Sequence, residues 1–298
     1  MNILGIDLIT LGVLDMEAGQ RFCRDYGLTE VETGAGGATF HAKDGTGLVL
    51  RRADDKALAM AVAPAPNLRE TIWGVADKAT LEAIGASLSA DRQVSRDDSG
   101  VLRTVDDDGY PIGFRVTERH AFEARPSLVN VPGLPPLRKA NIVADYDSAV
   151  RPSVMSHLVF LTPDLDRAAR FYTERLGFKV TDRYTGAGVF LRSGGSHDHH
   201  NLFLIKGEAL GLRHIAFHVR DHLELMIGGK HLVMKGWETA WGPGRHIYGS
   251  NYFWYFKSPF GGAIEYDADM DVVDDNWVPR ETKMGPDTAA VWNLSFLG

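Results

Sequence analysis

The chain has little cysteine, no excess of basic residues and no long apolar run, as is usual for a globular protein. It has a single cysteine, Cys23, so it forms no intramolecular disulfide; this fits a reducing compartment, and we expect a cytoplasmic protein. Its net charge of -7, from 32 basic and 39 acidic residues, gives no basic field for nucleic acid. No apolar run reaches the roughly 18 residues of a membrane span, so we expect no membrane partner.

The apolar N-terminus also lacks the marks of a secretory signal peptide. Residues 1–16 read MNILGIDLITLGVLDM, with Asp7 early in the run, no basic segment and no small-residue cleavage site. We therefore predict that this stretch is the first strand. The length of 298 residues and a hydrophobic content of 44% allow two globular domains or one large one.

The sequence contains an internal repeat. Residues 8–28 (LITLGVLDMEAGQRFCRDYGL) and 157–178 (HLVFLTPDLDRAARFYTERLGF) each predict a strand, a helix that begins at an Asp, and a stop at a Gly. Two further pairs follow in the same order: residues 68–77 with 212–221, and residues 107–113 with 259–265. Three similarities in one order indicate a duplicated chain.

The stretch between the two copies is rich in proline and shows little periodicity, so we predict a linker there. We place a non-catalytic module pair at residues 1–120, the linker at 121–152 and a metal-binding catalytic domain at 153–298. Each half predicts an α+β fold of two tandem βαβββ modules, whose mixed sheets curl around a pocket. The tail from Met270 is predicted to be a polar wrap outside the core.

Glu265 lies in a run of aromatic and β-branched residues, 244–265, that predicts a strand, a tight turn and a second strand. In the second strand Ala263, Glu265 and Asp267 share one face. A carboxylate in a buried strand is costly unless it is paired or binds a metal, so Glu265 needs a partner.

The repeat points to that partner. Equivalent points of successive modules in the second half hold His157, His214 and Glu265. The matching positions of the first half hold Leu8, Glu70 and Gly113. Two imidazoles and a carboxylate form the facial triad of mononuclear iron(II) oxygenases, which leaves three positions open for substrate and dioxygen. We predict one metal site, in the second half only.

Each of these residues also has a simpler interpretation. Either histidine could be an ordinary core or rim residue, and Glu265 could pair with Arg245. His218, four residues after His214 on the same strand face, is a competing ligand that we interpret as supporting or structural.

The residues of the second half resemble the type I extradiol ring-cleaving dioxygenases of the vicinal oxygen chelate superfamily, especially the two-domain catechol and 2,3-dihydroxybiphenyl enzymes. The family signature is Gly-x-His, an apolar residue and Tyr, then Pro-x-Gly and Glu. It stands here as Gly244-Arg-His246, Trp254-Tyr255, Pro259-Phe-Gly261 and Glu265. Trp254 and Ser258 depart from the usual residues, and neither change removes a reacting group.

The resemblance implies that His157, His214 and Glu265 bind Fe(II), or Mn(II), and that no further cofactor is needed. It implies extradiol cleavage of a substituted catechol, with both atoms of O2 incorporated, in aromatic hydrocarbon catabolism. His246 and Tyr255 would handle the substrate's protons. His200, in the segment DHHNLF, would face dioxygen as an imidazolium. We also expect a homo-oligomer.

The sequence also allows other interpretations of the residues around the predicted metal site and of the reaction. The histidines at 197, 199 and 200 could belong to a solvated loop. Four aromatic residues are candidates for the wall of the substrate pocket, although each could equally be a core residue: Phe203, Tyr248, Trp254 and Phe256. Trp254 and Phe256 alternate with Tyr255, so they should point away from its face. The same fold could instead serve a glyoxalase-type metal-dependent isomerase or lyase, a metal-free protein of the bleomycin-sequestering kind, or a homogentisate-forming keto-acid dioxygenase. The first does not need His200, His246 and Tyr255 together, and the second needs no facial triad.

Overall fold

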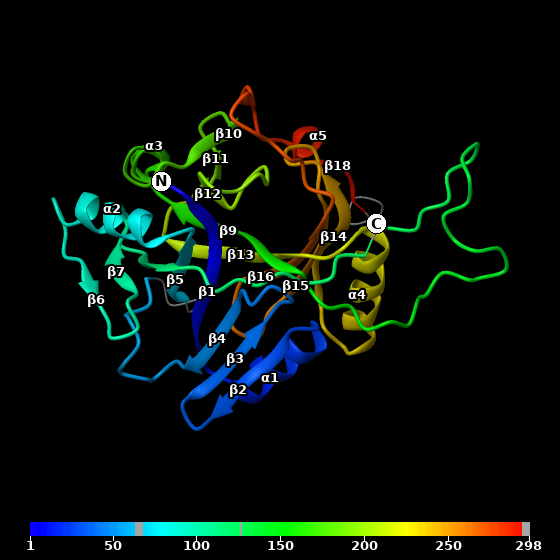
Figure 1. Ribbon diagram of the computed structural model, residues 1–298, viewed down its shortest axis with the longest axis horizontal. Coiled ribbons are helices and arrows are strands. Elements are labelled where there is room, and N and C mark those ends of the chain that lie inside the picture. The colour runs from blue at the N-terminus through cyan, green and yellow to red at the C-terminus, as the bar shows by residue number, and fades with distance from the viewer. Residues whose placement is uncertain (63–67, 126, 294–298) are drawn as a thin grey trace.

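The computed structural model describes residues 1–62, 68–125 and 127–293 (Figure 1). They form two mixed sheets, one of eight strands from the first half and one of ten strands from the second. The predicted α+β fold is therefore confirmed. Within the described residues, no helix is long and apolar enough to cross a membrane.

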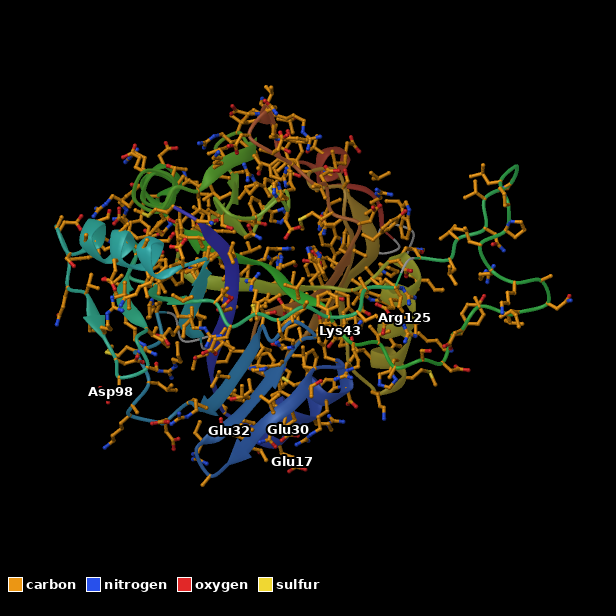
Figure 2. All side chains as sticks on the ribbon, in the orientation of Figure 1. Glu17, Glu30, Glu32, Lys43, Asp98 and Arg125 are labelled. Atoms are coloured by element: carbon orange, nitrogen blue, oxygen red, sulfur yellow. The ribbon has the colours of Figure 1, made fainter. Side chains whose placement is uncertain are left out.

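The first-half sheet joins two modules side by side in the order β2-β3-β4-β1-β5-β8-β7-β6. Its elements are β1 (Ile3–Val13), α1 (Met16–Asp25), β2 (Thr29–Gly34), β3 (Gly37–His41), β4 (Gly47–Arg52), β5 (Leu68–Val75), α2 (Lys78–Leu88), β6 (Ser95–Arg96), β7 (Leu102–Val105) and β8 (Pro111–Val116). Figure 2 shows Glu17, Glu30 and Glu32 on the outer surface beside α1 and β2, away from the second-half sheet.

The second-half sheet repeats this plan in the order β17-β10-β11-β12-β9-β13-β16-β15-β14-β18. Its elements are β9 (Val154–Thr162), α3 (Leu165–Arg170), the π-helical turn η1 (Phe171–Arg175), β10 (Lys179–Tyr184), β11 (Gly188–Arg192), β12 (Leu202–Lys206), β13 (Gly211–His218), α4 (His222–Met234), β14 (Thr239–His246), β15 (Tyr252–Lys257), β16 (Ala263–Ala268), β17 (Arg280–Thr282), α5 (Pro286–Ala289) and β18 (Ala290–Asn293).

Short local signals set the helix boundaries in both halves. The first helix of each half begins after an aspartate whose carboxylate accepts a backbone N–H three residues on, Asp15 in one half and Asp164 in the other. Gly27 and Gly177 follow these helices with φ of +91° and +71°, a conformation that favours glycine. The sequence predicted both starts and both stops.

The strand register confirms the matched positions of the repeat. Leu8 lies opposite Ile72, which lies opposite Gly113, while His157 lies opposite Ala216, which lies opposite Glu265. Two of the three bulges in the pairing of β1 with β5 recur at matching places in the pairing of β9 with β13. The two halves therefore present equivalent backbone, and only the second carries the triad.

The two halves share one hydrophobic core. Tyr26 of the first half stacks on Tyr266 of the second with ring centroids 4.1 Å apart, and Tyr110 stacks on Phe160 at the same distance. The Tyr26 hydroxyl also donates a 2.6 Å hydrogen bond to the carbonyl oxygen of Glu265. The first half thus supports the strand that carries the carboxylate.

The chain between the halves leaves the body as a long extended loop, green in Figure 1, and Figure 2 marks Arg125 within it. Its described residues between β8 and β9 contain no helix or strand. This agrees with a linker, although the exact boundaries at residues 120 and 152 stay a prediction.

The tail is more than the polar wrap that we predicted. Strand β17 adds to one edge of the second-half sheet beside β10, and β18 adds to the other edge beside β14. Val273 is buried, and the indole of Trp277 donates to the carbonyl oxygen of Thr181 at 2.7 Å. The prediction was wrong because short strands that pair only at sheet edges need no hydrophobic periodicity of their own.

Asp106, buried where the halves meet, makes the stability depend on pH. Burial raises its pKa to about 7, although the Tyr172 hydroxyl and backbone N–H groups donate to its carboxylate. Since the pKa in the unfolded chain is about 3.9, Asp106 favours the folded state below that pH, and this contribution is lost as the pH rises toward 7. We expect Asp106→Asn to raise the free energy of unfolding at pH 8, by on the order of 1 kcal/mol or more, and to change it little at pH 4.

Urea unfolding of both proteins at the two pH values measures this difference. An equal effect of the substitution at both pH values would contradict it.

Candidate metal centre

Three side chains from three strands of the second-half sheet meet at one point. Nε2 of His157 on β9, Nε2 of His214 on β13 and Oε2 of Glu265 on β16 lie 3.2 Å from one another in all three pairs. Their side chains are 3%, 11% and 0% exposed. The two strands β9 and β16 flank β13 in the sheet, so neighbouring strands supply all three atoms.

This triangle has the dimensions of one face of a metal coordination sphere. Ligand atoms about 2.2 Å from an octahedral ion stand about 3 Å apart on one face. The buried Oε2 of Glu265 receives no hydrogen bond from the described residues. The imidazole nitrogens of His157 and His214 are the polar atoms beside this anionic oxygen. A divalent cation would satisfy all three atoms at once, and the residues therefore fit the implied metal.

The other side of the His157 ring is fixed by a buried carboxylate. Asp267, two residues after Glu265 and on the same strand face, has its Oδ2 3.5 Å from Nδ1 of His157 and accepts a 3.0 Å hydrogen bond from Ser156. Its Oδ1 lies 2.7 Å from Nδ1 of His218. A carboxylate on the far ring nitrogen orients a ligating histidine. His218 is thus outside the triangle, as a support for Asp267.

The protonation of the triangle suits metal binding. Burial lowers the pKa of His214 to about 4 despite the nearby Glu265, so His214 is neutral at neutral pH, as a ligand must be. Burial also lowers the pKa of His157, but the carboxylates of Asp267 and Glu265 outweigh burial and raise it to about 9. His157 must lose that proton when a metal binds, so metal binding competes with protons.

A cavity of about 420 Å³ opens beside the triangle, on the inner face of the curled sheet. It is lined by His157, Val159, Tyr184, Phe190, His200, Phe203, Ile205, Arg213, His214, Ala240, Trp241, His246, Tyr248, Tyr255, Gly262, Ala263, Met284 and Ala289. Its volume and apolar walls are typical of a small-molecule site.

The predicted wall residues divide into two pairs. Phe203 and Tyr248 line the cavity, and Phe203 stacks on Phe190 at 3.8 Å. Trp254 and Phe256 do not line it, because they alternate with Tyr255 along β15 and point to the other face, where Trp254 packs closely against Gly229 of α4. This agrees with the alternation along the strand, which predicted that both residues point away from the face of Tyr255.

His246 and Tyr255 form a hydrogen-bonded pair on the cavity wall. Nε2 of His246 lies 2.9 Å from the Tyr255 hydroxyl, and its Nδ1 lies 3.1 Å from the carbonyl oxygen of Ala289. The carbonyl can only accept, so Nδ1 carries the proton, and in the neutral ring Nε2 accepts from Tyr255. Burial lowers the pKa of His246, and burial together with Glu265 raises the pKa of Tyr255 well above its usual value, so Tyr255 stays protonated.

His200 lines the same cavity at the end of a buried polar chain. Its ring centroid lies 4.3 Å from that of His157, and its Nδ1 lies 3.1 Å from Nδ1 of His199. His199 Nε2 is 2.8 Å from Asp182, which also accepts from Arg280 of β17. With a neutral His199 that donates to Asp182, Nδ1 of His200 is the donor between the two rings, and its Nε2 is left unprotonated.

Two expectations about this segment need correction. His199 and His200 are buried, so the solvated-loop interpretation is wrong for both and fits only the exposed His197. Burial also lowers the pKa of His200 well below its usual value, so in the free protein it is a neutral imidazole, not the imidazolium that we expected. Arg245 pairs with Asp269, which excludes the alternative that it neutralises Glu265.

Sequence reasoning missed the residues that hold these groups in place. Asp267 could have been found, because it is two residues after Glu265 and so shares its face. Asp182, Arg280 and Ala289 gave no signal, because they are brought together only by the pairing of β17 and β18 with the sheet edges.

Comparisons with known proteins agree with this architecture. A family model described as the Glyoxalase/Bleomycin resistance protein/Dioxygenase superfamily matches residues 154–266. Metapyrocatechase 2 of Cupriavidus necator is 34% identical over 193 residues, which make up 65% of this chain and 59% of that protein. An iron-dependent extradiol dioxygenase of Rhodococcus jostii is 26% identical over 156 residues, 48% of this chain and 51% of that protein. The chain therefore matches less than two thirds of the length of these curated relatives.

The solved structures extend the likeness to both halves. The Mn(II)-bound glyoxalase from Novosphingobium aromaticivorans superposes with a TM-score of 0.78 at 25% identity, over 98% of this chain and 91% of that one. Residues 154–266 are therefore similar to the glyoxalase/bleomycin resistance protein/dioxygenase superfamily, and the whole chain is similar in fold to the glyoxalase structure.

Proposed function

We propose that the protein is an extradiol ring-cleaving dioxygenase, which opens a substituted catechol beside its diol and incorporates both atoms of O2. The observation that carries this proposal is the meeting of a two-histidine, one-carboxylate triangle with three further groups on one cavity wall. His157, His214 and Glu265 are the proposed metal ligands, and His200, His246 and Tyr255 the proposed catalytic residues. The extradiol dioxygenases among its relatives support the same conclusion.

The proposed metal is iron(II), with manganese(II) as a substitute. One relative is named as iron-dependent, and the glyoxalase structure holds Mn(II). A metal held by His157, His214 and Glu265 would activate the catechol and dioxygen together. The single free cysteine fits an enzyme of the reducing cytoplasm.

The protein's own residues manage protons and exclude water. A catechol that binds a metal through both oxygens must lose a proton, and the unprotonated Nε2 of His246 accepts one through the Tyr255 hydroxyl. Neutral His200, which lies beside His157 on the cavity wall, can take up a second proton and return it to the reacting oxygen later. The stacked rings of Phe190 and Phe203 keep bulk water from the apolar side of the cavity.

Oxygen uptake tests this proposal directly. We expect protein loaded anaerobically with iron(II) to consume one O2 per substituted catechol and to form a yellow ring-opened product, followed with an oxygen electrode and by absorbance. A panel of monocyclic and bicyclic diols measures which aromatic ring system the protein prefers as substrate.

The glyoxalase-type alternative is tested with the same protein. Conversion of a glutathione hemithioacetal without oxygen uptake, together with no reaction on any diol, would replace the oxygenase by an isomerase of the same superfamily. Such an isomerase would have no use for the pair of His246 and Tyr255 beside the triangle.

A further inference from the structure

Arg213 is the one permanently charged side chain among the described residues that line the cavity. The other lining residues are histidines, aromatic and aliphatic residues, and glycine. Arg213 is exposed and directly precedes His214, so its guanidinium lies near the mouth of the cavity and within a residue of the triangle. A cation at the edge of an apolar pocket attracts an anionic group on a ligand whose ring fills the pocket.

A β-bulge accounts for the position of this arginine. In the pairing of β13 with β9, Leu212 lies opposite Phe160 and His214 lies opposite Val159, so Arg213 is the extra residue. A bulge of this kind re-aims a side chain and often lies next to an active site. Without the bulge, strict alternation would send Arg213 and His214 to opposite faces of the sheet, whereas both line the cavity.

The first half provides an internal comparison. Its matching residue, Arg69, is the extra residue of the same bulge, between the pairs Leu68 with Leu11 and Glu70 with Thr10. The guanidinium of Arg69 donates to the carbonyl oxygens of Ala53 at 2.9 Å and Ala59 at 3.0 Å. Both terminal nitrogens of the first-half arginine therefore donate to its own chain.

Arg213 has no such partners. Among the residues that the structure describes, none forms an ion pair with its guanidinium or accepts a hydrogen bond from it. The arginine of this bulge thus donates to its own chain in the first half, which has no triad. In the second half, which has the triad, it is available to a ligand.

We propose that Arg213 binds an anionic substituent of the substrate, so that the preferred catechols carry a carboxylate on the ring or on a short side chain. This inference rests on the proposed function and adds a substrate class to it. A guanidinium holds a carboxylate through two parallel hydrogen bonds, which a neutral ester cannot match. The metal-facing diol and the carboxylate would then hold the ring at two points across the cavity.

Anaerobic binding measures this preference without any need for turnover. Iron(II)-loaded protein is titrated calorimetrically with three catechols whose carboxylate is separated from the ring by zero, one or two methylene groups, each paired with its methyl ester. We expect at least one acid to bind about tenfold more tightly than its ester. In Arg213→Met this ratio should fall to about one, and Arg213→Lys should keep part of it.

The matched control is Arg69→Met, which removes the equivalent arginine of the first half. It should leave the ratio of acid to ester affinity unchanged. If Arg213→Met does not fold, Arg213→Gln carries the same expectation. Esters that bind as well as their acids in every pair, or an acid preference that survives in Arg213→Met, would overturn the inference and leave ring cleavage untouched. Conversely, a preference that depends on Arg213 without oxygen uptake on any diol would contradict the proposed reaction and retain the anion site.

Discussion

Replacement of His214 by alanine is expected to remove the metal and to reduce dioxygenase activity by at least about 1000-fold. The substitution deletes one corner of the 3.2 Å triangle and leaves His157 and Glu265 as a buried ion pair, in which a proton takes the place of the cation. Two ligands from one side of the site cannot compete with that proton for the metal. Metal analysis after dialysis, together with oxygen uptake, measures both effects.

The duplicated scaffold offers a control for this variant. Glu70 occupies the position of His214 in the first half, and it pairs with Arg103 at 2.7 Å on a strand without a triad. Glu70→Ala should therefore keep its metal and most of its activity. Full metal content in His214→Ala would show that the proposed ligands are wrong.

The second large effect is expected at His200. Replacement by glutamine keeps a polar group of similar reach but removes the group that can accept and return a proton, and kcat should fall by about 100- to 1000-fold. Metal content should not change, since His200 lies outside the triangle. Steady-state kinetics with metal analysis separates this outcome from the loss of metal in His214→Ala.

His197→Gln serves as the matched control, because this exposed histidine three positions away lines no part of the substrate cavity. Asp182→Asn should produce a smaller loss than His200→Gln, since it leaves His200 in place and weakens the chain that fixes its ring through His199. An unchanged kcat in His200→Gln would contradict the proposed proton transfer.

Much of the fold could be predicted because each local sequence signal for a helix start or stop occurs at the same place in both copies of the repeat. An Asp that begins a helix or a Gly that ends one is a weak indication alone, but Asp15 with Asp164, and Gly27 with Gly177, occur at matched places. The proposed ligands could be picked out for the same reason, because His157 and Glu265 stand where the first half has Leu8 and Gly113.

The rest depended on contacts between segments that the sequence does not connect. Burial of His199 requires Asp182 on β10 and Arg280 on β17, which are 98 residues apart along the chain. The tautomer of His246 requires the carbonyl oxygen of Ala289, and any residue type could supply that oxygen. Backbone groups and edge strands leave no pattern in side-chain chemistry. The sequence therefore pointed to Phe203 and Tyr248 on the cavity wall and gave no sign of the groups behind it.

The hydrogen bond from Tyr26 to the carbonyl oxygen of Glu265 makes the metal centre sensitive to substitutions in the first half, although that half supplies none of the proposed ligands. Tyr26 and its stacking partner Tyr266 are constrained, because a change in either would shift the strand that carries the carboxylate. We therefore expect the first half to tolerate substitution least where it contacts this strand.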